Sequence, residues 1–181
     1  MTKLLLPALS LLLSPILASA VPQGQIYALQ YPTIPADPKD AITVGCINAA
    51  GALTLTDCSL FSHIEGSIGT FSSAQGNCTF LDSSTPAHPS ERYGEGSHAW
   101  KCGGTTSETD ANPVEFYYLM RVSGWTDGYA VIGNGNLHLF YDVPSLPTTK
   151  EDEIPVWRYL WDLPEGHERV ALLWVPKPVE G

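Results

Sequence analysis

The chain has few basic residues and no pattern typical of a long helix. Nine lysines and arginines stand against nineteen aspartates and glutamates, which gives a formal net charge of −10 over 181 residues. The chain therefore lacks the basic stripe that proteins use to bind a nucleic-acid backbone, and we expect no nucleic-acid partner. No segment keeps the 3.6-residue apolar period of an amphipathic helix.

The common catalytic and cofactor motifs are absent as well. There is no G-x-S-x-G serine motif and no glycine-rich phosphate loop between a strand and a helix. The four cysteines are separated by 11, 19 and 23 residues, whereas zinc sites use gaps of about two to four. No two histidines have the i,i+4 spacing of a helical metal site. We therefore predict no metal and no cofactor.

The longest apolar run lies at the N-terminus. Residues 1–20 contain Lys3, the run LLLPALSLLLSPIL and the small-residue end Ala18-Ser19-Ala20. This order is typical of a secretory signal peptide, and the run is too short and too rich in proline to span a bilayer. We expect cleavage after Ala20, which leaves one secreted, extracellular domain over residues 21–181 with no membrane attachment. Loss of Lys3 brings its net charge near −11.

All four cysteines lie between residues 46 and 102. In a secreted chain they predict two disulfides among Cys46, Cys58, Cys78 and Cys102, and the sequence leaves three pairings open. The segment Asn77-Cys78-Thr79 is a glycosylation sequon, so we predict a glycan on Asn77. Its middle cysteine weakens the sequon, because oxidation can precede glycan transfer.

Short β-branched and apolar segments alternate with glycine and proline turns. Strands are predicted at 25–31, 41–48, 52–58, 97–101, 115–123, 156–163 and 169–175, with a hairpin over 128–142. Segments that begin at Gly51, Gly76 and Gly135 share a turn glycine, alternating apolar residues and a final aspartate. We interpret them as three separate hairpins, with an internally symmetric barrel as the alternative. The predicted fold is all-β: a single compact β-sandwich or a β-barrel or trefoil-like domain stapled by two disulfides.

One set of residues has the side chains of an acid–base catalyst. Glu115, Arg121 and His138 offer the base, phosphate clamp and acid that a metal-free nuclease needs. They have no recognisable motif spacing, and the acidic chain would repel RNA. Carboxylate pairs for glycoside hydrolysis have no short signature, so none is assigned. We interpret the chain as non-catalytic, with a small secreted acid–base hydrolase of polysaccharide or RNA as the alternative.

Aromatic residues alternate near the C-terminus. Trp157, Tyr159 and Trp161 would share one face of a strand. A row of rings can stack on sugars or on a protein partner, whereas packing in the core is the other interpretation. We predict these three as binding residues for an extracellular glycan or protein surface.

Residues 46–102 also carry a loose set of motifs: GNCTFLD at 76–82, YG at 93–94 and HAWKC at 98–102. With the signal peptide and four cysteines, they resemble the small secreted four-cysteine proteins of filamentous fungi, a group without an agreed activity. The resemblance implies cell-wall association or interaction with a host, in an effector-like role. It carries over no catalytic residue.

Overall fold

The computed structural model describes residues 21–30, 34–64, 70–90, 97–103, 117–134 and 139–178. Within these ranges the chain has twelve strands and one short 3-10 turn, η1 (Pro38–Asp40), so the all-β prediction is confirmed. The strands are β1 (Gln23–Gln30), β2 (Thr43–Ile47), β3 (Leu53–Thr54), β4 (Leu60–Ile64), β5 (Thr70–Ser73), β6 (Gly76–Thr79), β7 (Lys101–Cys102), β8 (Tyr117–Met120), β9 (Ala130–Asn134), β10 (Phe140–Val143), β11 (Trp157–Arg158) and β12 (Glu168–Lys177). No helix among the described residues has the length and apolar character to cross a membrane. The predicted signal peptide lies outside these ranges.

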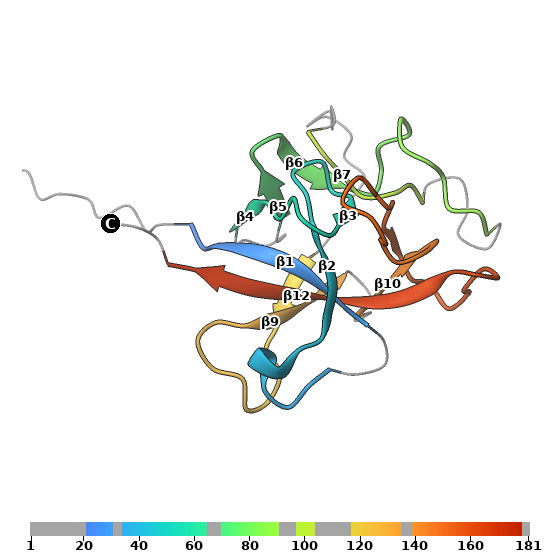
Figure 1. Cartoon of the computed structure of the whole chain (residues 1–181). Helices are drawn as coiled ribbons and strands as arrows, with labels where there is room; N and C mark the ends of the chain where they lie inside the picture. The colour runs from blue at the N-terminus through green and yellow to red at the C-terminus, as the bar shows by residue number, and fades with distance from the viewer. Residues whose placement is uncertain are drawn as a thin grey trace, which may run out of the picture.

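The first and last of these strands form the centre of a single antiparallel sheet. β1 pairs with β12 along its full length, from Gln23 opposite Lys177 to Gln30 opposite Val170. β4 and β2 pair with successive parts of β1. In Figure 1 the β1–β12 ribbon crosses the whole view, with β4 to β7 on one side and β9 on the other. The ribbon thus connects otherwise separate parts of the sheet.

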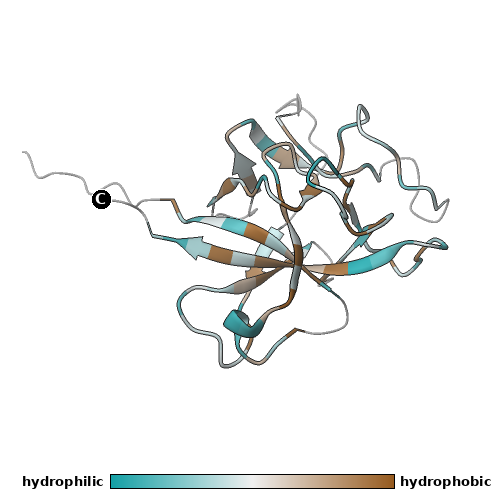
Figure 2. Cartoon of the chain, viewed as in Figure 1, coloured by the Kyte–Doolittle hydropathy of each residue, from teal (hydrophilic) through white to brown (hydrophobic). Residues whose placement is uncertain are grey.

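The middle of β12 is apolar because both of its faces are buried. Val170, Leu172 and Trp174 pack in the main core, while Ala171 and Leu173 pack in a second cluster on the opposite face. Successive side chains of a strand point to opposite faces, so this arrangement requires a continuous apolar run rather than alternation. Figure 2 shows the run in brown between hydrophilic ends. Burying each large side chain stabilises the fold by about 1.5–3 kcal/mol.

The main core is rich in aromatic rings. Phe71 has no exposed surface and its ring lies 5.5 to 6.3 Å, between centroids, from the rings of Tyr117, Trp174 and Trp100. Phe80 stacks on Trp100 at 5.7 Å. Phe71, Tyr117 and Trp174 lie on β5, β8 and β12, while Phe80 and Trp100 lie next to β6 and β7, so the core holds together strands that are far apart in sequence.

All four cysteines are paired, as predicted, and the structure settles the pairing. Cys46 is bonded to Cys58, and Cys78 to Cys102. The second bridge joins residues directly opposite each other on β6 and β7. The two turn glycines that the structure describes have the predicted positive φ, +100° at Gly51 and +126° at Gly76. A side chain at Gly51 would also meet the Trp100 carbonyl oxygen at 2.9 Å.

Several local predictions are wrong. Residues 128–142 do not form a hairpin, because β9 and β10 do not pair with each other. β9 pairs with Leu172–Trp174 and β10 with Glu168–Ala171, so they lie end to end along one edge of β12. The strands expected at 156–163 and 52–58 are only β11 and β3, each two residues long. The strand expected at 97–101 begins only at Lys101, as β7.

Candidate functional site

The acid–base trio from the sequence is only partly described. Arg121 is exposed just after β8, while Glu115 and His138 lie outside the described residues. The trio therefore stays a prediction. Asn77 is exposed on β6, where a glycan would project into solvent.

The aromatic row does not share one face. Trp157 is 4% exposed, and its indole N–H donates to the Pro86 carbonyl at 3.1 Å. Trp161 is 76% exposed and has a φ of +80°, which is rare for a residue other than glycine. The shared face was wrong because β11 ends at Arg158 and the backbone then leaves the strand conformation. Whether these residues bind a ligand stays a prediction, and Trp161 offers the accessible ring.

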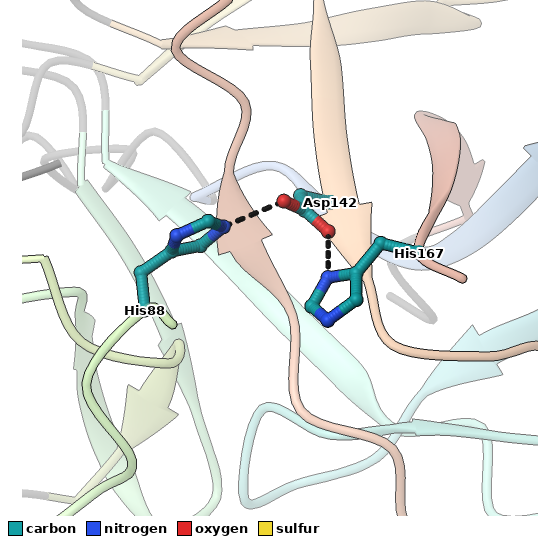
Figure 3. Close-up of side chains that lie close together, drawn as sticks. All are labelled: His88, Asp142 and His167. Carbon is teal, nitrogen blue, oxygen red and sulfur yellow. Dashed lines mark hydrogen bonds and ion pairs between the residues drawn. The ribbon is translucent and has the colours of Figure 1, made fainter. Parts of the chain in front are cut away.

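A cluster that the sequence analysis did not assemble lies beside this segment. The carboxylate of Asp142 is fully buried and has a histidine at each oxygen (Figure 3). Nε2 of His88 lies 2.6 Å from Oδ2, and Nδ1 of His167 lies 2.6 Å from Oδ1. The ring of Trp157 packs against both imidazoles, with centroids 5.5 Å and 6.0 Å away. We call these residues, His88, Asp142 and His167, the His–Asp–His triad.

Each member of the triad is placed by a different element. Asp142 lies on β10, opposite Trp157 of β11 and Arg169 of β12. His88 follows an isolated bridge, and its backbone N–H donates to the Ser97 carbonyl at 2.8 Å. His167 ends a turn closed by its backbone N–H on the Pro164 carbonyl at 3.0 Å, immediately before β12. The triad thus ties a loop and a turn to the sheet.

Hydrogen bonding fixes the tautomer of His88. The backbone N–H of Ser90 donates to Nδ1 of His88 at 3.1 Å, so Nδ1 must present a lone pair. Since a carboxylate only accepts hydrogen bonds, Nε2 carries the proton and donates to Asp142. His88 is therefore a neutral imidazole that holds one carboxylate oxygen in place. The Ser90 hydroxyl also donates to Asp162 at 2.5 Å, which fixes this loop further.

His167 is the only member of the triad with side-chain exposure, at 12%. Nδ1 donates to Asp142, which leaves Nε2 on the side of the ring away from the carboxylate (Figure 3). His167 lines a solvent-open hollow of about 370 Å³, together with Leu163, Gly166, Glu168 and Arg169. A buried carboxylate behind one nitrogen and a hollow beside the ring form the arrangement in which histidine accepts protons from ligands.

The triad also has the residue types of a metal site, and its ligand atoms all lie within 4.8 Å of one another. The surroundings of His88 disfavour this use. A metal-bound histidine normally donates its other ring N–H to an acceptor, whereas Nδ1 of His88 faces the Ser90 N–H donor. The two contacts of 2.6 Å are also typical of charge-assisted hydrogen bonds. We therefore interpret the cluster as a hydrogen-bonded triad.

Sequence reasoning missed the triad because its members are 54 and 25 residues apart. One signal was present: Asp142 stands between Tyr141 and Val143 inside an apolar strand segment. An acid on a buried strand needs hydrogen-bond donors, and histidines are common donors.

Comparisons with protein-family models, with curated proteins and with solved structures find no match to this chain.

Proposed function

We propose that this chain is a secreted, effector-like protein that binds a neutral cell-wall glycan around Trp161. Export is supported by the leader-like residues 1–20 and by the two disulfides, which persist in oxidising surroundings. The resemblance to small secreted fungal proteins supports a cell-wall setting. The observation that carries the proposal is the 76% exposure of Trp161, because large exposed aromatic residues are typical of binding surfaces.

The backbone at Trp161 supports a binding role. Its positive φ costs about 1–3 kcal/mol for such a residue, and such strain concentrates at functional positions. Because of this conformation the chain does not continue the strand that contains the buried Trp157, and Trp161 is exposed to solvent.

Polar groups line a hollow that begins two residues after Trp161. Leu163, which lines the hollow, is two residues from Trp161, so their Cα atoms are within about 7 Å. The guanidinium of Arg169 lies over the Tyr159 ring at 5.1 Å and also lines the hollow. Arg169 donates hydrogen bonds and Glu168 accepts them, which together suit sugar hydroxyls.

A neutral glycan fits this surface better than an anionic one. The apolar face of a sugar ring can stack on indole, and its hydroxyls can reach the polar groups of the hollow. The chain carries a net charge of −10, which repels acidic polymers.

The test is binding of the purified protein to insoluble chitin, β-glucan and cellulose, measured as depletion from solution. Trp161→Ala should weaken binding to the preferred polymer about tenfold or more, since it removes a central aromatic contact. The matched control is Ile42→Ala, because Ile42 is also highly exposed, at 79%, in a different part of the chain. The proposal would be contradicted if wild-type protein bound none of the three polymers, or if the Trp161→Ala variant bound as well as the Ile42→Ala variant.

A further inference from the structure

We infer that Asp142 and His167 form a general-base dyad that hydrolyses neutral esters in the hollow beside β12. This inference shares the hollow with the glycan-binding proposal, but it rests on the His–Asp–His triad, whereas glycan binding rests on Trp161. It assigns a catalytic role to residues that the sequence analysis did not connect.

The orientation of His167 is the first support. Asp142 has no exposed surface, and both of its oxygens accept a hydrogen bond at 2.6 Å. Because His88 holds Oδ2 in place, the carboxylate cannot rotate away from His167. A fixed carboxylate keeps the proton of a neutral imidazole on Nδ1 and leaves Nε2 with the lone pair. The same carboxylate stabilises the imidazolium that forms when Nε2 takes a proton.

The hollow is the second support. The hollow opens to solvent, and its volume of about 370 Å³ is enough for an ester group and a water. Arg169 lies on β12, two residues after His167, and lines the hollow together with it. Its guanidinium, packed over Tyr159 at 5.1 Å, gives the lining of the hollow a positive charge that can stabilise an oxyanion.

The reaction follows from these positions. Nε2 of His167 takes a proton from water as the water oxygen forms a bond to the ester carbonyl carbon. The carbonyl oxygen becomes an oxyanion beside Arg169. The carbon–oxygen bond to the alcohol then breaks as the oxyanion collapses, and the imidazolium gives its proton to the departing alkoxide. The products are a carboxylic acid and an alcohol, and His167 returns to its neutral form.

The number of acid–base groups selects the substrate class. One imidazole can both accept and return the proton in ester hydrolysis. Glycoside hydrolysis needs two carboxyl groups on opposite sides of the bond, and among the described residues only Glu168 adds a carboxylate to the hollow lining. The net charge of −10 opposes phosphodiesters. A neutral ester is the substrate that remains.

The experiment uses p-nitrophenyl acetate and the whole mature protein. Wild type should hydrolyse it faster than an equal concentration of free imidazole, and His167→Gln should lower the rate about 10²-fold or more. The rate should fall in acid, because a protonated imidazole cannot accept a proton. His167 contacts Asp142, its ring lies 6.1 Å from that of His88, and Glu168 and Arg169 line the hollow with it. The matched control is His98→Gln, since Nδ1 of His98 contacts the Thr85 carbonyl oxygen at 3.0 Å and His98 does not line the hollow, and its rate should equal that of wild type.

A second measurement avoids any effect of the substitution on folding. Diethyl pyrocarbonate modifies unprotonated imidazole, and the modified peptides can be counted by mass spectrometry. Loss of ester hydrolysis should follow modification of His167 and not that of His98. The inference is overturned if wild type is no faster than imidazole, if folded His167→Gln keeps the wild-type rate, or if hydrolysis persists after His167 is modified. Because p-nitrophenyl acetate is not a glycan, failure here leaves the glycan-binding proposal standing, and the reverse also holds.

Discussion

His88 and Asp142 are separated by 54 residues, yet their side chains meet at 2.6 Å and neither has exposed surface. The contact holds the loop at His88 against β10, the strand that lies between β11 and β12. Burial of such a pair is tolerable only because every polar atom facing the carboxylate is a donor. The pair therefore holds the His88 loop against the sheet and also fixes the carboxylate that contacts His167.

Replacing Asp142 should destabilise the protein strongly. Asp142→Ala leaves two buried imidazole N–H groups without their acceptor, at a cost of about 1–3 kcal/mol each. We expect the free energy of unfolding to fall by about 3 kcal/mol or more, measured by urea denaturation. Asp57→Ala is the control, because Asp57 is exposed and its loss should change stability by less than about 0.5 kcal/mol. A small effect at Asp142 would mean that the triad is not buried.

The aromatic core gives a second prediction. Phe71→Ala should lower the free energy of unfolding by about 3–5 kcal/mol, because it removes a fully buried ring packed among three others. Leu60→Ala on the adjacent strand is the comparison, since Leu60 is 49% exposed and its truncation removes much less buried apolar surface. Equal losses in the two variants by chemical denaturation would contradict this packing.

The two disulfides should differ slightly in their effect. Their cysteines are 12 and 24 residues apart, so loop-closure entropy gives about 2.8 kcal/mol for Cys46–Cys58 and about 3.4 kcal/mol for Cys78–Cys102. Paired serine substitutions at each bridge, followed by denaturation, measure both values. A peptide map of the unreduced protein checks the pairing, and cross-linked peptides that join Cys46 to Cys78 or Cys102 would refute it.

Asp82 should contribute to stability in a defined pH range. Its pKa is lowered from 3.8 to about 2, first by hydrogen bonds from the hydroxyl and backbone N–H of Ser84 and further by Lys101, whose ammonium lies 3.0 Å away. Because the folded state favours the charged carboxylate, the contribution is complete above about pH 4 and is lost as the pH falls toward 2. The stability difference between wild type and Asp82→Asn should therefore shrink over this interval in urea titrations. A difference that stays constant from pH 6 to pH 2 would contradict the lowered pKa.

Glycosylation of Asn77 has a simple test. The protein expressed through a secretory pathway should lose mass on enzymatic deglycosylation, because Asn77 is exposed and belongs to an N-x-T sequon. Asn77→Gln should abolish this loss while leaving secretion intact. The same mass measurement reads the N-terminus, which we expect at Val21. An unchanged mass after deglycosylation would show that the sequon is unused.

Local patterns in the sequence predicted much of the fold. The β-branched run at 41–48 and the apolar run at 169–175 became β2 and β12, and the glycines at 51 and 76 adopted the turn conformation that only glycine adopts cheaply. The hairpin at 128–142 failed for a physical reason. β9 and β10 find better partners on β12, where apolar residues on both faces cover them, and this long-range pairing outweighs the local turn signal.

The site was much less accessible to sequence reasoning. The backbone at Trp161 has a positive φ, which the residue pattern does not predict. The assumption of strand alternation therefore placed Trp161 on the same face as the buried Trp157, whereas Trp161 is exposed. The triad depends on the register that sets Asp142 opposite Arg169 and next to the turn at His167. Register across such separations follows from packing of the whole sheet, and a linear pattern of histidines does not contain it.

The pairing of β1 with β12 also has a consequence for biogenesis. β1, near residue 23, cannot complete its pairing until residues near position 177 have been synthesised and have left the ribosome. The cysteines between 46 and 102 emerge well before that moment, and their cross-links can form while β12 is still being made. A stop codon placed just before β12 should therefore yield a chain with both native bridges and no completed sheet.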